Sequence, residues 1–372
     1  MKIAQYAGIA LLVLLLLAGG GLFLFLNQAK FGKVPGGERL ARIERSPHYR
    51  DGQFRNLVDK PSLAEGTSFV RIGWEFFFRE RERPEPPAPV PSLKTDLKAL
   101  PDDRNVLVWF GHSSYFIQID GRKVLVDPVF GPNASPFTFT TKPFAGTNRY
   151  TVDDMPFVDY LFITHDHWDH LDYETIPALK DKVGTIVCGL GVGAHLEYWG
   201  IDPAKIIETD WGDTTALDPG FIIHTETAHH FSGRGLRRNP SLWVSYVLQT
   251  PSFRLYLGGD SGYGPHFADI GARFGGFDVA ILENGQYDEN WKYNHMFPEE
   301  TLRAAADLKA RNLFPVHSGK FRLSNHPWDE PLRRIAALNG DRGRRLLTPM
   351  VGEAVRLGDT SQVFTRWWEN LR

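Results

Sequence analysis

The chain has 372 residues, which corresponds to one large α/β domain with attachments, or to two domains of about 150 residues. Hydrophobic residues make up 42% and charged residues 23%, so the composition excludes wholesale disorder, collagen and coiled coil. The 42 basic and 44 acidic side chains leave a net charge of −2, which provides no global field that attracts nucleic acid. The single cysteine, Cys188, excludes an intramolecular disulfide and cysteine-rich zinc modules, but it does not decide the compartment.

The N-terminal segment is predicted to span a membrane. No charged side chain lies between Ile3 and Ala29, and the apolar run Ala7–Leu26 forms a helix of about 30 Å, the thickness of the hydrocarbon core. A secretory signal has an apolar region of about 7–15 residues, whereas this one continues beyond Gly19–Gly21. An uncleaved membrane anchor over residues 1–29 is therefore favoured over a cleaved signal.

The side of the membrane on which the rest of the chain lies stays open. Only Lys2 precedes the span, whereas six basic and two acidic residues follow it within residues 30–50. The positive-inside rule would hold the large domain in the cytoplasm. N-terminal anchors nevertheless often export the domain that follows them, so both orientations are retained.

Two polar segments follow the anchor. Residues 27–50 form a basic, glycine-containing connector, and five prolines within residues 84–91 predict a stiff, extended strap. We predict that residues 30–104 are connector and strap, and that residues 105–372 form the main domain. An aromatic block at residues 74–78 is expected to pack on that domain, with a lipid-facing patch as the alternative.

Short β-rich runs alternate with helical stretches in the main domain. Strands are expected over Val106–Phe110, Tyr115–Ile119, Lys123–Val126, Tyr160–Thr164, Thr185–Cys188, Phe221–Thr227, Leu242–Gln249, Arg254–Leu257, Val279–Leu282 and Leu313–Val316. A helix is predicted to begin at Pro298, because proline suits its first turn and two glutamates stand at the positive end of its dipole. A second helix is expected near Asp172–Lys180. This order predicts a layered α/β architecture with helices outside packed sheets.

The densest cluster of chemically active side chains lies in Phe162-Ile-Thr-His-Asp-His-Trp-Asp-His-Leu-Asp172. At the tip of a strand, alternate side chains such as His165 and His167 can converge on one ion. Asp169 and His170 begin the next turn and can face a second ion. Imidazole and carboxylate are suitable ligands for zinc, iron or manganese. The alternative is a polar surface cluster at the end of a buried strand.

Three later residues extend this pattern. His230, Asp260 and His317 each follow a β-like run, and loops at the C-terminal ends of strands gather functional groups in α/β proteins. Each of them singly can be a capping residue or an ordinary hydrogen-bonded side chain. Together they supply what two metal ions need, although the adjacent His229 leaves the register of one ligand ambiguous.

These segments resemble the metallo-β-lactamase fold superfamily. Within it, the chain is most similar to the branch of N-acylphosphatidylethanolamine-hydrolysing phospholipase D and L-ascorbate-6-phosphate lactonase-like proteins. The resemblance is carried by Trp109-Phe-Gly-His-Ser-Ser-Tyr115, Leu125-Val-Asp-Pro-Val-Phe130, Thr164-His-Asp-His-Trp-Asp-His-Leu-Asp172, His230-Phe-Ser-Gly-Arg-Gly235, Gly258-Gly-Asp-Ser-Gly-Tyr263 and Val316-His-Ser-Gly319. They extend over residues 109–319, with weaker similarity around Ser46–Asn56, and the N-terminal span lies outside the resemblance.

The resemblance implies a four-layer αββα sandwich with a two-metal site at one edge. It implies that the first ion is held by His165, His167 and His230, the second by Asp169, His170 and His317, and that Asp260 bridges them. His230 is preferred to His229 because it directly precedes the Phe-Ser-Gly-Arg string of the branch. The two divalent ions are expected to be zinc, with manganese or iron as alternatives.

Further residues are expected to assist the reaction. Asp169 and Asp260 are expected to act in catalysis as well as in metal binding, since Asp169 can orient the nucleophile. His295 resembles a family position near the site and is expected to protonate a leaving oxygen or to contact phosphate. A role in ordering the loop before the Pro298 helix is an equal alternative for His295.

Three polar residues near the motifs are expected to support the site without binding metal. His112 and Asp127 are expected to be structural. Asp172 is expected to orient a metal-binding histidine or to cap the following helix.

The function that follows is that of a membrane-anchored, binuclear metal-dependent hydrolase. The anchor and the branch favour a phospholipase D-like phosphodiesterase acting on N-acylphosphatidylethanolamine or a related phospholipid. The ligand set does not choose the substrate, so a lactonase or a hydrolase of a small phosphorylated metabolite is the first alternative. A non-catalytic membrane scaffold and an oxygen-reducing diiron protein are alternatives of other classes. No basic patch indicates a nucleic-acid partner, and the oligomeric state is not predicted.

Overall fold

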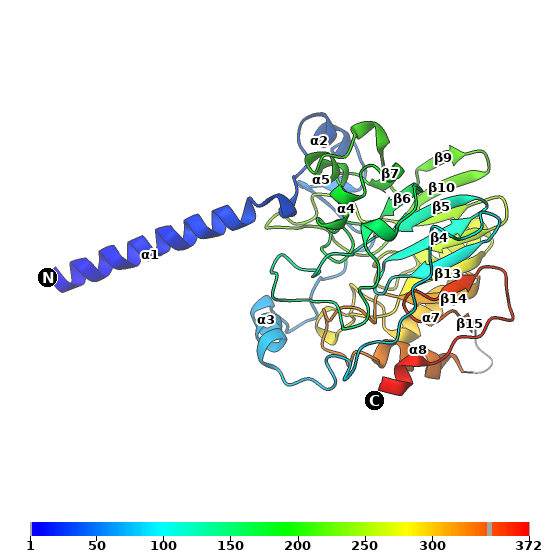
Figure 1. The fold of residues 1–372 in the computed structure, drawn as a ribbon. Helices are drawn as coiled ribbons and strands as arrows, with labels where there is room; N and C mark the ends of the chain where they lie inside the picture. Colours follow the sequence, from blue (N-terminus) through cyan, green and yellow to red (C-terminus); the bar gives the residue numbers. More distant parts are fainter. Residues whose placement is uncertain (1, 341–343, 372) are drawn as a thin grey trace.

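Two seven-stranded sheets pack face to face in the computed structural model, which describes residues 2–340 and 344–371 (Figure 1). The first sheet has the order β16-β3-β4-β5-β6-β7-β8, and the second has the order β15-β14-β13-β12-β11-β10-β9. In the first sheet, the strands from β16 to β5 pair antiparallel and those from β5 to β8 pair parallel, as the pairings β4·β5 and β5·β6 illustrate. In the second sheet, the strands from β15 to β12 pair parallel and those from β12 to β9 pair antiparallel. A separate hairpin is formed by β1 and β2.

The strands of each sheet have the following bounds. The first sheet contains β3 (Val106–Trp109), β4 (Tyr115–Ile119), β5 (Arg122–Val126), β6 (Val158–Ile163), β7 (Val183–Gly189), β8 (Ile206–Thr209) and β16 (Ala354–Arg356). The second contains β9 (Thr214–Asp218), β10 (Phe221–Glu226), β11 (Ser245–Gln249), β12 (Arg254–Leu257), β13 (Phe277–Glu283), β14 (Ala310–Val316) and β15 (Arg345–Leu346). The hairpin strands are β1 (Tyr49–Arg50) and β2 (Gln53–Phe54).

The helices lie outside the sheets. The α-helices are α1 (Lys2–Leu26), α2 (Gly37–Ile43), α3 (Phe69–Phe78), α4 (Thr175–Ala178), α5 (Gly193–Tyr198), α6 (His266–Phe274), α7 (Pro298–Asp307) and α8 (Glu330–Asn339). Short 3-10 helices are η1 (Ala29–Phe31), η2 (Val152–Asp154), η3 (Pro203–Lys205), η4 (Glu289–Trp291) and η5 (Trp367–Leu371).

Three apolar layers hold this arrangement together. The central layer lies between the sheets and includes Phe162 of β6 and Leu248 of β11. On the outer face of the first sheet, Leu161 packs in a cluster with residues of α4 and α5. On the outer face of the second sheet, Ala280 and Leu313 pack in a cluster with residues of α6, α7 and α8. The predicted four-layer αββα sandwich is therefore confirmed.

The ten expected strands correspond to β3–β7 and β10–β14, and α7 begins at Pro298 as predicted. The expected run Leu242–Gln249 is a strand only from Ser245, because the N–H groups before it are directed at the first sheet. Val244 N, for example, donates to Thr164 O at 2.9 Å. The helix expected near Asp172–Lys180 is limited to the short α4.

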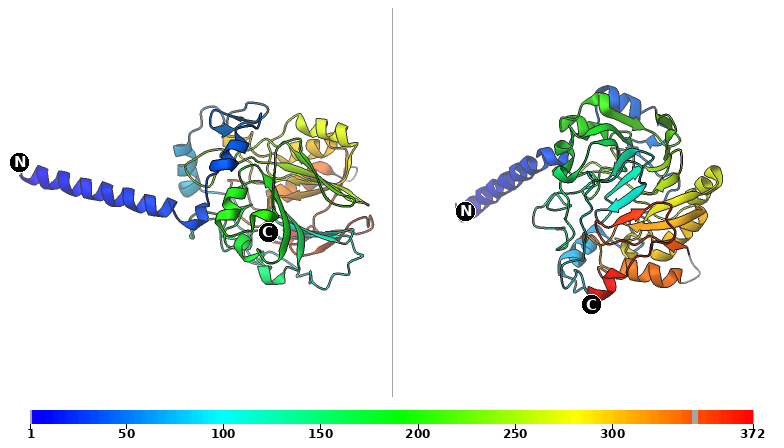
Figure 2. Two further views of the ribbon diagram at one scale, coloured as in Figure 1. Left: turned by 90° about the horizontal axis from the view of Figure 1, so that it is seen from above. Right: turned by 45° about the vertical axis from the view of Figure 1, so that its right-hand side comes forward.

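The N-terminal helix α1 projects from one side of the sandwich, as Figures 1 and 2 show. Its 25 residues are long and apolar enough to cross a membrane, and none of them is buried. The helix α3 lies on the same side of the domain in both figures.

The segment between α1 and β3 packs on the sandwich. Ile43, Phe54 and Val90 are buried in the central layer, and Leu97 is buried in the layer beneath α4 and α5. In the aromatic block at residues 74–78, the side chains of Phe76 and Phe77 lie outside the described part of the structure.

Candidate metal centre

The site residues come from strands that end at one edge of the sandwich. In the first sheet, β5, β6 and β7 run parallel, and β3 has the same direction because it is separated from β5 by the antiparallel β4. In the second sheet, β12, β13 and β14 run parallel, and β10 has their direction for the same reason. The loops after β3, β6, β10, β12 and β14 carry the clustered histidine and aspartate side chains.

His165, His167 and His230 lie together. His165 Nε2 lies 2.9 Å from His167 Nδ1, and His230 Nε2 lies 3.2 Å from the same atom. One nitrogen of each ring lies within 4.8 Å of the others, so the three rings can hold one cation. His229 belongs to no such group within the described ranges, and its backbone N–H donates to Ser261 Oγ at 2.9 Å.

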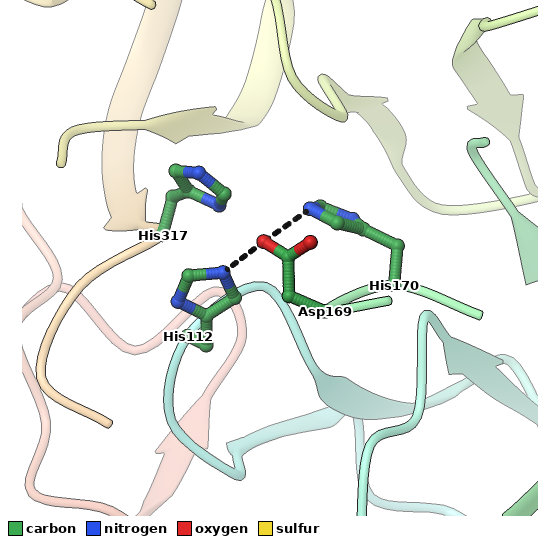
Figure 3. A group of neighbouring side chains, drawn as sticks. All are labelled: His112, Asp169, His170 and His317. Carbon is green, nitrogen blue, oxygen red and sulfur yellow. Dashed lines mark hydrogen bonds and ion pairs between the residues drawn. The ribbon is translucent and has the colours of Figure 1, made fainter. Parts of the chain in front are cut away.

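Asp169, His170 and His317 form a second group, to which His112 also belongs (Figure 3). Asp169 Oδ2 lies 2.8 Å from His112 Nε2 and 3.5 Å from His170 Nε2. Figure 3 shows the Asp169 carboxylate between these two rings and the His317 ring facing them. This group can hold a second cation, and His112 fixes the carboxylate that belongs to it.

Asp260 lies between the two groups. Its Oδ2 lies 3.2 Å from His170 Nε2 and 3.7 Å from His230 Nε2. Its Oδ1 lies 3.2 Å from His317 Nδ1. A carboxylate that touches both groups can bridge two cations.

Unusual backbone conformations bring these side chains together. His112 and His317 have φ angles of 54° and 65°, which non-glycine residues rarely adopt. Two backbone hydrogen bonds hold them, since His112 N donates to Ser318 O and His317 N donates to His112 O, each at 3.0 Å. Before Asp260, Gly259 has a φ of 59°, and a Cβ there would lie 2.9 Å from Val244 O. Strained backbone of this kind clusters at functional sites.

Hydrogen bonds on the far side of the rings set their orientation. Asp127 Oδ2 lies 2.8 Å from His170 Nδ1 and accepts a hydrogen bond from Thr164 Oγ1 at 2.6 Å. His230 Nδ1 lies 3.2 Å from the carbonyl oxygen of Asn294, to which it donates. Because an acceptor holds the proton of each ring on Nδ1, the Nε2 atoms of His170 and His230 keep a lone pair that is directed at the site.

The electrostatics of the site favour cation binding. Burial lowers the pKa of His165, His230 and His317 well below the usual value, so these rings are neutral at pH 7 and can donate a lone pair. Burial also raises the pKa of Asp260 to about 6. Asp260 Oδ1 and His170 Nε2 are buried without a hydrogen-bond partner in the described part of the chain, and a cation would satisfy both. The residues present therefore fit two divalent cations.

Arg234 holds the loop that carries the HisXHisXAspHis run. Its buried Nη1 donates to the carbonyl oxygens of Asp166, within the run, and of Leu171, directly after it, at 2.9 and 2.6 Å. Its Nε and Nη2 donate to Lys30 O at 3.1 and 2.9 Å, and its guanidinium carbon lies 4.0 Å from the centre of the Trp168 ring. Burial lowers the pKa of Arg234 to about 10, which keeps it charged. Arg234 thus joins the segment after α1 to the loop that carries this run.

His295 lies beside the cluster and is held by Glu283. Its ring is 5.0 Å from that of His317, with 18° between the two planes. Its Nδ1 lies 2.6 Å from Glu283 Oε2, while Glu283 Oε1 accepts a hydrogen bond from Met296 N at 2.7 Å. Glu283 is not among the residues predicted from the sequence. A signal existed, because a carboxylate directly after the Val279–Leu282 run follows the same rule that identifies Asp260.

Asp172 lies at the beginning of α4. Its carboxylate accepts hydrogen bonds from Thr175 Oγ1, from Glu174 N at 3.2 Å and from Gly131 N at 2.8 Å. These contacts support the capping role among the two roles expected for Asp172.

A cavity of about 280 Å³ lies over the cluster. Its polar lining includes His167, Asp169, His230, Asp260, His295 and His317. Its apolar lining consists of Leu63, Ile72, Phe231, Trp291 and Leu323, and Arg238 lies among them with its guanidinium carbon 5.0 Å from the centre of the Phe231 ring. A polar floor beneath apolar walls suits a ligand that joins an ionic group to an apolar one.

Comparisons with known proteins agree with this architecture. A family model described as "Beta-lactamase superfamily domain" matches residues 122–318. The uncharacterized protein Rv0906 of Mycobacterium tuberculosis is 38% identical over 317 residues, which cover 84% of this chain and 85% of the relative. N-acyl-phosphatidylethanolamine-hydrolyzing phospholipase D 1 of Caenorhabditis elegans is 30% identical over 232 residues, which cover 57% of this chain and 63% of that protein.

A solved structure has the same fold. Igni18, a metallo hydrolase from Ignicoccus hospitalis, superposes with a TM-score of 0.50 and 21% identity, covering 68% of this chain and 97% of that one. The matched residues 122–318 make up more than half of the chain and contain every proposed metal ligand from His165 to His317. The chain therefore belongs to the metallo-β-lactamase superfamily, which includes metal-dependent hydrolases.

Proposed function

We propose that this protein is a membrane-anchored, binuclear phosphodiesterase that hydrolyses N-acylphosphatidylethanolamine or a related phospholipid in a phospholipase D-like reaction. The observation that carries the proposal is the cavity, in which apolar walls adjoin a floor of metal-ligating side chains. A phospholipid uses both surfaces, since its phosphate favours cations and its acyl chains favour apolar contact. The similarity to the Caenorhabditis elegans phospholipase and the apolar helix α1 support the same substrate class.

Two sets of residues would hold the cations. His165, His167 and His230 would hold the first, Asp169, His170 and His317 the second, and Asp260 both. Zinc is the proposed metal, because imidazole and carboxylate are its ordinary ligands, and manganese or iron would accept the same set. When bound, two such cations lower the pKa of a water molecule and neutralise charge on a phosphoryl oxygen.

The other roles belong to side chains of this chain. Asp169, fixed by His112 at 2.8 Å, would orient the attacking water toward phosphorus. His295, fixed by Glu283, would give a proton to the leaving oxygen. Arg238 in the cavity wall would pair with the charge of the substrate phosphate.

The membrane attachment forms part of the proposal. Residues 1–29 would anchor the protein, residues 30–104 would connect and strap, and residues 105–372 would carry the reaction. The apolar length of α1 supports the anchor, and recovery of the intact chain in carbonate-washed membranes is the expected result. A soluble form that begins after residue 20 would contradict it.

The substrate is tested by product formation with the full chain. Wild type, Asp260→Ala and the exposed-surface control Asp269→Ala are compared on N-acylphosphatidylethanolamine, bis(p-nitrophenyl) phosphate and a lactone, with bound metal measured in each. We expect phospholipid and phosphodiester hydrolysis in wild type and in the control. Asp260→Ala should lose metal and lower turnover at least about a thousandfold, because the bridging ligand of both cations is removed.

Each alternative function has its own result. Hydrolysis of only the lactone would replace the phospholipid with the lactonase alternative. Activity that neither chelation nor Asp260→Ala changes would remove the metal mechanism. A protein that binds metal and turns over none of the three substrates would favour the non-catalytic scaffold.

A further inference from the structure

The helix α3 has one face on the cavity. Ile72 lines the cavity directly. Glu75, on the neighbouring turn, accepts a hydrogen bond from Asn290 Nδ2 at 3.1 Å, which ties the helix to the η4 segment. Ser68 caps the helix by accepting from Arg71 N at 3.2 Å. The helix therefore forms a wall of the proposed active site.

The opposite face of α3 is apolar and exposed. Val70, Trp74 and Phe78 follow one another at a spacing of four residues and expose 84%, 64% and 68% of their surfaces. The Trp74 and Phe78 rings lie 4.4 Å apart, so the stripe is continuous. Large apolar side chains gathered in this way on a surface mark an interaction site.

One flank of this stripe carries two arginines. Arg71 and Arg79 each expose 59% of their side chains and pair with Glu75 at 2.9 and 3.6 Å. An apolar stripe with arginines along one side is typical of a helix that lies in the interface of a membrane with anionic lipids. Arginine side chains there keep their guanidinium groups at the level of the phosphates.

The position of α1 indicates what covers α3. In Figures 1 and 2, α1 leaves the sandwich on the side where α3 stands. The end of α1 is seated on the domain, since the Phe25 ring stacks on that of Phe137 at 5.2 Å. Phe139, whose ring lies 5.7 Å from that of Phe137, and Leu236, which lines a pocket together with Leu26, expose 71% and 85% of their surfaces. A bilayer crossed by α1 therefore meets this side of the protein.

We propose that the outer face of α3 docks on the lipid bilayer that α1 spans. The helix then separates the bilayer from the metal cavity, with Trp74 and Phe78 among the lipids and Ile72 facing the substrate. A phospholipid would reach the cations past this helix without leaving the membrane for water. The inference rests on the proposed membrane anchoring, and it extends the proposed function by naming the surface through which the substrate arrives.

Docking is tested with a fluorescent label in the full chain. A nitrobenzoxadiazole label is attached to Trp74→Cys, and the natural Cys188 is buried and unreactive. The control label is on Ala216→Cys, at an exposed position of β9, on the far side of the sandwich from α1 in Figure 1. Both proteins are reconstituted in vesicles of phosphatidylcholine and phosphatidylglycerol with doxyl-labelled lipid.

We expect the doxyl lipid to quench the label at position 74 at least about fivefold more than the control label, since interfacial helices insert about 5–10 Å into the bilayer. Equal quenching at the two positions would overturn the proposal. Cross-linking between two copies through position 74 would also overturn it, because the stripe would then be covered by a second copy of the chain.

A kinetic comparison tests the route of the substrate. The double variant Trp74→Ser, Phe78→Ser should raise KM for vesicle-borne phospholipid about tenfold and leave turnover of bis(p-nitrophenyl) phosphate unchanged, because it removes lipid contact only. Loss of both activities would make α3 a purely structural wall and contradict the proposal.

The docking and the substrate can fail separately. Quenching at position 74 without hydrolysis of N-acylphosphatidylethanolamine would overturn the proposed substrate and support docking. Hydrolysis without quenching would support the substrate and overturn docking.

Discussion

Glu283 and His295 form a pair whose geometry assigns one role to each residue. The carboxylate accepts from Met296 N and contacts His295 Nδ1, so both of its oxygen atoms are engaged. Glutamine has a single acceptor oxygen and cannot replace both contacts. We expect Glu283→Gln to lower kcat about tenfold with little change in KM, because the ring of His295, the proposed proton donor, loses its orientation. Steady-state kinetics on a soluble phosphodiester measure this split.

The matched control is Glu226→Gln. Glu226 is also a buried carboxylate at the end of a strand of the second sheet, but its partner is Arg273 and it lies outside the cavity lining. The control should keep its kcat. Loss of bound metal in Glu283→Gln would contradict the assignment, since Glu283 also lies within 4.8 Å of Asp260 and His317 and would then belong to the metal ligands.

Individual residues differ in how far the sequence predicts their position. His165, His167 and His170 are predictable as neighbours, because a turn after a strand keeps them within reach of one point. Their meeting with His317 depends on two left-handed backbone positions and on the hydrogen bonds of residue 112 with residues 317 and 318. Such pairings join distant segments, so neither composition nor periodicity reveals them.

At the scale of elements, a series of aromatic contacts joins α1 to the loop after β6, which carries the HisXHisXAspHis run. The Phe31 ring lies 5.2 Å from that of Phe25 at the end of α1. The Phe31 ring also lies 5.2 Å from the ring of Trp168, in an edge-to-face arrangement. Trp168 stands between His167 and Asp169 in the chain, so the contact supports the backbone that carries both proposed ligands.

We expect Phe31→Ala to weaken metal binding about tenfold, because residues that support metal ligands affect affinity by about 10–100-fold when they are replaced. Competition with a chromophoric chelator measures the affinity in the full chain. The control is Val34→Ala, at a 41% exposed position of the same connector, where we expect no change. An unchanged affinity in Phe31→Ala would show that the aromatic contacts stabilise only the packing of α1.

Strands were predictable from the sequence where burial requires a run of apolar residues. β3–β7 and β10–β14 read as apolar runs because their side chains are buried in the layers of the sandwich. The strand β9 was not predicted, because it lies at the edge of its sheet and has exposed, polar residues such as Thr214. The helix α6 was not predicted either, since it contains Gly271, which lowers helix propensity, and it gains its order from packing on the second sheet.

At the scale of the whole molecule, the candidate metal centre lies across the two sheets. The first sheet and its loops supply His165, His167, Asp169 and His170, and the second supplies His230, Asp260 and His317. The apolar layer between the sheets was predictable from the alternation of buried strands. The position of the connector was not, because its contacts, such as that of Lys30 O with Arg234, join segments far apart in the chain.

A centre built in this way should stabilise the fold when cations are bound. Binding to the folded state alone contributes about 4 kcal/mol when the free metal is 1,000 times its Kd. For a domain of this size, each kcal/mol raises Tm by about 2–4 °C. We therefore expect chelation to lower the Tm of the wild type by about 10 °C. Calorimetry of the detergent-solubilised full chain, before and after chelation, measures the change.

The same experiment on Asp260→Ala separates metal binding from other effects of the chelator. Because Asp260 bridges the two groups, its loss should leave a Tm that chelation hardly changes. Hydrogen exchange should increase on chelation in the loops after β6 and after β14 together, since the cations connect both. An increase confined to the loop after β6 would mean that the cations are held by the first sheet alone, and it would contradict a centre shared between the sheets.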